Sequence, residues 1–361
     1  MSPLTKRERV LRTAHFQETD RTPVYDILQN DAVIHHYAAE ILGAETLNTS
    51  NGRRLTGFAI GRCLDMTRMP NGPSETGETQ MDNGIRVHQE RWTSWITWRP
   101  FQTTEEMVAW VEGEIRRAEA QVFDAAYRDA FYTWLDECDA YSAAGDPTQR
   151  GDPVVQVIES GVGLTEIYWM LGWEHLTTLM FEYPDLLEGW LDARHRAELR
   201  RVAAIADPQR IPIALTYDDI ASKNGPLFSP KWLRRCWQPR LRQLVEAWHQ
   251  RDALCLYHSD GNLWMVLDDL VAAGIDGLNP LEVLAGMTVK EVRARYPRLF
   301  LTGGIDVSQL LPFGSPAEVR AVCRQTIADA DGLGYFLGSS TELHWDVPLE
   351  NARAMFEVGS G

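Results

Sequence analysis

From about residue 154 onward, short apolar runs alternate with longer amphipathic segments, and this alternation limits the fold more than any other feature. Strands that alternate with helices through short connections predict a parallel sheet, because each parallel neighbour needs a crossover helix. Two earlier apolar runs raise the count to about eight strand–helix units. We therefore predict an α/β fold, a (β/α)8 TIM barrel, with an open doubly wound sheet as the alternative. The strands are expected at 24–28, 56–63, 154–158, 211–217, 253–257, 275–279, 298–302 and 334–338.

The N-terminal third departs from this regular pattern. Residues 65–84 are polar and broken by proline and glycine, which predicts a long loop. Residues 85–98 alternate between apolar and polar side chains, as in a β-hairpin, and 104–142 are helical and charged. We predict one barrel domain over residues 1–361, with an inserted lobe of loop, hairpin and helices at about 62–150.

Composition narrows the classes of partner. The net charge of −16 argues against nucleic acid or an anionic membrane as a partner, because both repel an acidic surface. No GxGxxG or GxxxxGK motif is present, so we expect no nucleotide cofactor. The five cysteines are scattered without CxxC spacing, which favours neither disulfides nor a thiolate zinc site. No apolar run is long enough to span a membrane and no signal peptide is visible, so we predict a cytoplasmic protein.

The most informative candidate site follows the strand at 253–257. His258 and Asp260 are two residues apart, so both side chains leave the same face of an extended backbone, and Gly261 allows a sharp turn. In parallel α/β proteins, the carboxyl ends of strands are where ligands and metals bind. An imidazole and a carboxylate at this position predict a metal or acid/base site. The alternative is that both residues only hydrogen-bond the loop backbone.

Ionisable or polar side chains follow nearly every predicted strand, and most are acidic. So many like charges around one mouth would repel unless a cation lies among them. We predict a divalent metal bound by His258, Asp260 and Glu282, with His344 or Glu342 as the fourth ligand. Nitrogen and oxygen donors without thiolate suit Zn²⁺, which we favour, and also Fe²⁺ or Mn²⁺. The candidate acid/base residues are Asp218, Asp219 and Asp26, and the candidate substrate-binding residues are Glu159, Tyr217, Lys223, Asn279 and Asp306.

Several stretches, in this order and spacing, are similar to one known family. They are Arg7–Val10 with Asp20–Val24, Tyr257–Asn262, Gly277–Glu282, Gly303–Asp306 and Val347–Asn351. The chain resembles the uroporphyrinogen decarboxylase superfamily in these residues, and the resemblance implies a (β/α)8 barrel. The decarboxylase branch carries arginines after the first strand, but Leu28 occupies that position here, which weighs against a tetrapyrrole substrate.

The other branch of the superfamily comprises zinc-dependent methyltransferases. They bind zinc through His-x-Cys after the fifth strand and a cysteine after the eighth. Here His258 matches the histidine, Asp260 replaces the first cysteine and Thr341 lies near the second, while Glu282 has the spacing of a glutamate ligand in related methionine synthases. Carboxylates give a more Lewis-acidic ion than thiolates, which favours activation of an oxygen-bearing substrate over thiol methylation.

Three functions follow from these residues and from the resemblance. The first is a metal-dependent enzyme that transfers or removes a methyl group on a small molecule, with a corrinoid protein as an implied partner. The second is a metal-free decarboxylase, in which Asp26 or Asp218 stabilises a protonated intermediate and His344 is the acid. The third is a non-catalytic barrel that clamps a ligand with its tryptophan-rich lobe. By resemblance to the family we also expect a homodimer.

Overall fold

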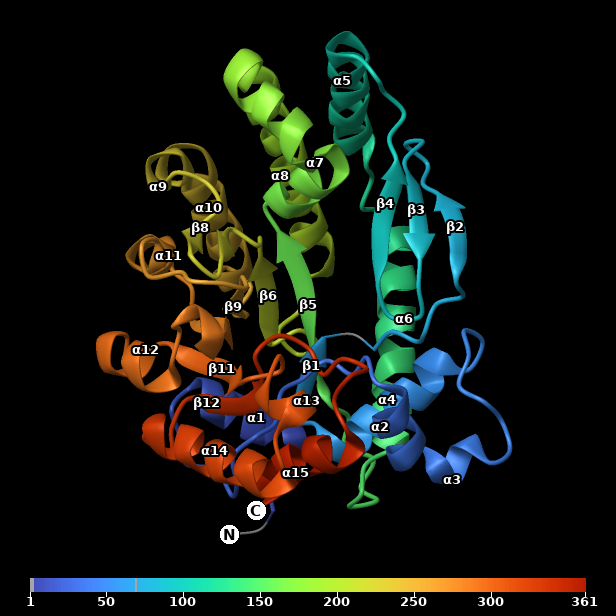
Figure 1. Ribbon diagram of the computed structural model, residues 1–361, viewed down its shortest axis with the longest axis vertical. Coiled ribbons are helices and arrows are strands. Elements are labelled where there is room, and N and C mark those ends of the chain that lie inside the picture. Colours follow the sequence, from blue (N-terminus) through green and yellow to red (C-terminus); the bar gives the residue numbers. More distant parts are fainter. Residues whose placement is uncertain (1–2, 69) are drawn as a thin grey trace.

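The computed structural model describes residues 3–68 and 70–361, and its centre is a curled, parallel, seven-stranded sheet with helices around its outer side (Figure 1). The strands follow the order β1-β5-β6-β9-β10-β11-β12. β5, β6, β9, β10, β11 and β12 coincide with runs predicted from sequence to within a few residues, so the α/β class is confirmed, whereas the strands expected at 24–28 and 56–63 differ. Their bounds are Met66–Arg68 for β1, Val155–Gly161 for β5, Ile213–Tyr217 for β6, Leu254–His258 for β9, Gly277–Leu281 for β10, Phe300–Ile305 for β11 and Tyr335–Ser339 for β12.

The predicted first strand, 24–28, is reduced to isolated bridges between the two edges of this sheet. Val24 forms a parallel bridge with Leu337 of β12, and Tyr25 forms one with Met66 of β1. The backbone N–H of Tyr25 donates to the carbonyl of Leu337 at 2.9 Å. A two-residue segment therefore lies between β12 and β1.

The core has two parts, which follow from the alternation of side chains along the strands. One cluster fills the inside of the curled sheet and includes Tyr25, Val157, Leu215, Leu256 and Phe336. The larger cluster lies between the outer face of the sheet and the helices. Because strand residues alternate between these two clusters, side chains at 159, 217 and 258 continue the inner row toward the carboxyl ends of the strands.

Helices cover the outer face of the sheet. The breaks predicted at Gly172 and Pro184 are present: Gly172 has φ 74° inside α7, and Pro184 begins α8. Among the described residues, no helix is both long enough and apolar enough to cross a membrane. The α-helices are α1 Lys6–Ala14, α2 Asp31–Tyr37, α3 Ala39–Leu42, α4 Gly52–Cys63, α7 Leu164–Glu182, α8 Pro184–Ile205, α9 Pro230–Trp232, α10 Gln238–His249, α11 Leu267–Ala273, α12 Val289–Arg295, α13 Leu310–Phe313, α14 Pro316–Asp329 and α15 Leu349–Ser360.

The strand predicted at 56–63 is wrong, because these residues form α4 and the strand lies just beyond, at 66–68. Nine of the twelve residues of α4 are buried, so the polar face of a surface helix is reduced to Arg53, Arg54 and Arg62. Gly57 and Gly61, one helical turn apart, allow close packing against α6: a Cβ on Gly61 would lie 2.0 Å from the carbonyl oxygen of Ser142.

The inserted lobe stands to one side of the curled sheet (Figure 1). It consists of the antiparallel strands β2 Gly77–Gln80, β3 Arg86–Gln89 and β4 Ser94–Trp98, followed by α5 Thr104–Ala120 and α6 Ala125–Ala144. The hairpin predicted at 85–98 is present and gains β2 as a third strand. The loop predicted at 65–84 is shorter than expected, because β1 and β2 occupy part of it.

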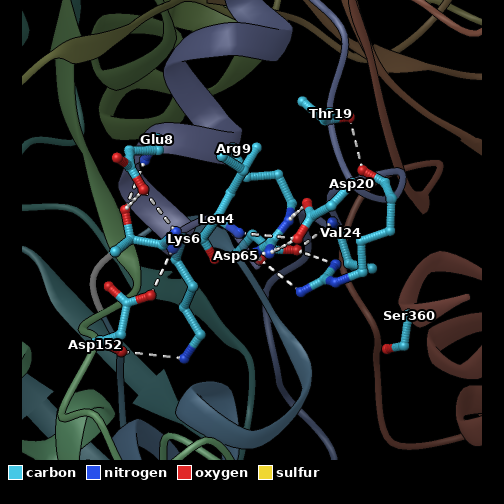
Figure 2. Close-up of polar contacts among 12 residues, drawn as sticks. Leu4, Lys6, Glu8, Arg9, Thr19, Asp20, Val24, Asp65, Asp152 and Ser360 are labelled. Atoms are coloured by element: carbon cyan, nitrogen blue, oxygen red, sulfur yellow. Dashed lines mark hydrogen bonds and ion pairs between the residues drawn. The ribbon is translucent and has the colours of Figure 1, made fainter. Parts of the chain in front are cut away.

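A buried ionic cluster joins α1 to the amino end of β1 (Figure 2). Arg9 donates to Asp65 at 2.7 Å and to both oxygens of Asp20, while Arg21 donates to both oxygens of Asp65. The N–H of Val24 donates to Asp65 at 2.9 Å. The side chain of Asp65 is 0% exposed, so these donors replace water completely. The N-terminal residues that carry the family resemblance therefore hold the fold together.

Candidate functional site

Three candidate residues meet at the carboxyl ends of β6 and β9. Each of Asp219, His258 and Asp260 offers a ligand atom, and these atoms lie within 4.8 Å of one another. Nε2 of His258 lies 3.7 Å from Oδ1 of Asp219. Parallel pairing produces this meeting, because Tyr217 and His258 are partners in register and the chain continues from each into the same rim. We call Asp219, His258 and Asp260 the rim triad.

Asn279, on the next strand, orients the imidazole of the rim triad. Its Oδ1 lies 2.6 Å from Nδ1 of His258, and its Nδ2 donates to Thr302. Because the amide nitrogen is used by Thr302, the oxygen faces His258 and accepts from Nδ1–H. The lone pair of Nε2 is then directed toward the two carboxylates. A histidine held in this way through its other nitrogen is typical of metal ligands.

Asp260 is the least satisfied member of the rim triad. Its Oδ1 is buried and has no hydrogen-bond partner among the described residues. Burial raises the pKa of Asp260 to about 6, and the negative charges of Asp219, Glu342 and Glu282 act in the same direction. Its backbone N–H donates to Oδ1 of Asp219 at 3.2 Å. An unpaired buried carboxylate oxygen among other carboxylates is an environment that a cation would stabilise.

A short hairpin contacts the loop that follows β9 and carries Asp260. Its strands are β7 Ala221–Ser222 and β8 Gly225–Pro226. The N–H of Asn262 donates to the carbonyl of Ser222 at 2.8 Å. Gly261 has φ 89°, and a Cβ there would lie 2.6 Å from the oxygen of Ser222. Lys223, predicted to bind substrate, is exposed at the turn of this hairpin.

Two of the four predicted metal ligands lie outside the rim triad. Glu282 follows β10, and its Oε2 accepts from the N–H of Gly261 at 2.7 Å, so it supports the loop of Asp260. His344 lies beyond β12 with its ring against Trp345, and its Nδ1 faces the N–H of Asp346. Asp219, predicted as an acid/base residue, takes the third position instead.

Asp218 and Asp26 are buried in structural hydrogen bonds. Asp218, 0% exposed, accepts from the N–H of Thr165 at 2.7 Å and from the indole of Trp237 at 2.8 Å. Asp26, 1% exposed, accepts from both the N–H and the hydroxyl of Ser339. Burial raises the pKa of each carboxyl to about 7. Both carboxylates are therefore enclosed by protein hydrogen-bond donors.

The remaining predicted residues have separate positions. Asp306 accepts from the backbone N–H groups of Ser308, Gln309 and Leu310, as a cap does. Tyr217 donates to Glu166, and its burial raises the pKa of the phenol. Glu159 pairs with Arg68 at the end of β1.

Two cavities of about 400 Å³ and 410 Å³ open beside this rim, and both are lined by Tyr127, Glu159 and Arg201. Sequence reasoning missed Arg68, Arg201 and Glu166, all of which line these cavities. The sequence offered one signal for Arg68, because it lies close to the start of the loop that proline and glycine interrupt. No sequence pattern indicated Arg201 or Glu166, which lie within the long helices α8 and α7.

The fold and the rim together define an α/β protein with a curled parallel sheet whose carboxyl end carries a polar site. The family model described as uroporphyrinogen decarboxylase (URO-D) matches residues 163–360, more than half of the chain. The chain therefore belongs to the uroporphyrinogen decarboxylase family, as the sequence motifs predict, and that family is one of enzymes.

A solved structure of a methyltransferase from Methanosarcina mazei has a similar fold. Its TM-score is 0.67 at 17% identity, with 99% of this chain and 98% of that chain covered. Alanine–tRNA ligases from Pyrobaculum arsenaticum and Pyrobaculum neutrophilum are 29% identical over 171 and 177 residues, which are 40% and 42% of this chain. The chain spans only 18% and 19% of the length of these curated relatives.

Proposed function

We propose that this chain is a metal-dependent enzyme that transfers or removes a methyl group on an oxygen-bearing small molecule. The observation that supports it most directly is the rim triad, with one imidazole nitrogen and two carboxylates within 4.8 Å. We also propose that the bridges of Val24 and Tyr25 stand for the first strand of an eight-stranded barrel, which would place the rim triad at the mouth of that barrel.

The residues at the rim fit a divalent cation. His258, fixed through Asn279, would supply Nε2, and Asp219 and Asp260 would each supply one oxygen. The unpartnered Oδ1 of Asp260 supports this fit, because a bare buried carboxylate oxygen is costly. A donor set without sulfur suits Zn²⁺, Fe²⁺ or Mn²⁺. Such an ion, when bound, supplies Lewis-acid polarisation of a substrate oxygen.

The chain's own residues hold this arrangement in place. Asn279 fixes the ring of His258, and Glu282 fixes the turn at Gly261 through its N–H. Tyr217, a phenol at neutral pH, donates to Glu166 beside the cavity. We propose that the substrate enters through this cavity and that a corrinoid protein receives or supplies the methyl group. The metal-free decarboxylase has weaker support, because the carboxylates of Asp26 and Asp218 are buried and already accept hydrogen bonds from protein donors.

Metal content tests the proposal. Protein reconstituted with Zn²⁺, Fe²⁺ or Mn²⁺ and then desalted should retain about one ion per chain, and His258→Ala should lose it. His249→Ala is a matched control and should retain the ion. His249 belongs to a second close group of donors, with Cys255 and Asp276, near the opposite, amino end of β9. Retention of the ion by His258→Ala, or no retention by the unmodified protein, would contradict the proposal. Methyl transfer is then measured with a methyl ether as the donor and cob(I)alamin as the acceptor. The absorbance of methylcobalamin reports the product.

A further inference from the structure

Arg68 places a cationic group at the rim, away from the acidic side chains of the rim triad. It ends β1 and pairs with Glu159 of the neighbouring strand β5. The side chain of Arg68 is 34% exposed and that of Glu159 is 41% exposed, so the pair is open to a ligand. A guanidinium has five N–H donors, and one carboxylate uses only some of them.

The cavity of about 400 Å³ in front of Arg68 has an aromatic wall. Tyr127, Phe131 and Trp134 project from one face of α6, at helical spacing, into the same cavity that Arg68 and Glu159 line. A flat apolar wall beside a guanidinium matches a ligand that has a ring and one anionic group.

Arg68 and the rim triad lie at separate parts of the rim. In the sheet order, β1 with Arg68 and β9 with His258 are three strand steps apart. Three steps correspond to about 14 Å along the sheet. The acidic side chains Asp219, Asp260 and Glu282 follow β6, β9 and β10 on the far side. A molecule with an anionic end and a neutral heteroatom at its other end would bind in one orientation only.

We propose that the substrate is a small aromatic carboxylate, whose carboxylate binds Arg68, whose ring lies on the aromatic wall of α6, and whose second oxygen substituent faces the rim triad. Only the last clause rests on the proposed function. Binding of the carboxylate and the ring needs neither a metal nor turnover.

The test uses metal-free protein and the two probes benzoate and benzamide, which have the same shape and differ in charge. Titration calorimetry and ligand-observed NMR should show benzoate binding about tenfold tighter than benzamide or more. Arg68→Gln should remove this preference, and Arg68→Lys should keep part of it.

Arg295→Gln is the matched control, because Arg295 of α12 forms an exposed pair with Asp268 of α11. It should bind both probes as the unmodified protein does. Equal binding of the two probes, or no binding of either, would overturn the proposal. So would an unchanged preference for benzoate in the Arg68→Gln variant, provided that its circular dichroism spectrum matches that of the unmodified protein. Since no metal is present, these results are independent of the outcome of the metal measurements on His258→Ala.

Discussion

The Nδ1 atom of His258 lies 2.6 Å from Oδ1 of Asn279, so a neighbouring strand fixes the imidazole that faces Asp219 and Asp260. Asn279 is itself held by Thr302 on β11. The orientation of one ring therefore depends on side chains from three consecutive strands of the sheet.

Asn279→Ala is expected to weaken metal binding by about 10- to 100-fold, because the ring of His258 loses the partner that fixes its tautomer. Asn279→Asp keeps an acceptor at the same position and should bind metal more tightly than the alanine variant. Competition with a chromogenic chelator measures both affinities. Equal affinities for the unmodified protein and Asn279→Ala would show that Asn279 does not support the ring.

Asp65→Ala is expected to lower the free energy of unfolding by about 3–5 kcal/mol, because it leaves Arg9 and Arg21 without their shared carboxylate. Asp268→Ala is the control, since the Asp268 side chain is 74% exposed in its pair with Arg295 and should cost less than about 1 kcal/mol. Urea unfolding measures both. Similar losses in the two variants would contradict a special role for the buried cluster.

Stability should depend on pH through Asp26. Burial raises the pKa of this carboxyl to about 7, so between about pH 4 and 7 the native state keeps a proton that the unfolded state has lost. The contribution of Asp26 to stability therefore falls as pH rises through this range and is constant above it. In Asp26→Asn this fall is absent, so the stability of the variant relative to the unmodified protein should improve by up to about 4 kcal/mol from pH 4 to 7.

The comparison is made by urea unfolding of both proteins at several pH values. The absolute stability of Asp26→Asn should still be lower at pH 4, because an amide cannot accept from both groups of Ser339. A stability difference between the two proteins that stays constant from pH 4 to 7 would show that Asp26 titrates normally.

Gly261→Ala is expected to destabilise the protein by more than about 1 kcal/mol and to weaken metal binding. The residue has φ 89°, and its Cβ would meet the backbone of Ser222, which displaces the loop of Asp260. Gly43→Ala is the control, because Gly43 also has a positive φ, 59°, but has open space around its Cβ position. Thermal unfolding and metal competition separate the two effects, and only Gly261→Ala should change metal affinity.

Most of the fold could be predicted from sequence, because strands buried on both faces appear as apolar runs at regular intervals. The exception, 56–63, shows where periodicity fails. A helix packed between others is mostly apolar, and a largely apolar run of eight residues has no period that separates it from a strand. The spacing of Gly57 and Gly61 was the one local sign of helix–helix contact.

The position of the site could also be predicted, but the roles of its members could not. Sequence places Asp219, His258, Asp260 and Glu282 at one rim, because strand ends meet there. It does not state which way a side chain turns: Glu282 turns to the N–H of Gly261, whereas Asp219 turns to His258. Likewise Asp218 and Asp219 are adjacent in sequence, yet opposite directions of their side chains make one buried and the other accessible.

The cluster of Arg9, Asp65 and Arg21 lies at the amino ends of the strands, and the rim triad lies at their carboxyl ends. Arg9 and Arg21 are part of the N-terminal signature by which the chain resembles its family. That signature reports ion pairs at the amino ends of the strands. It gives no information on the reaction at their carboxyl ends. A name transferred through it would carry an architecture to this chain without carrying a reaction.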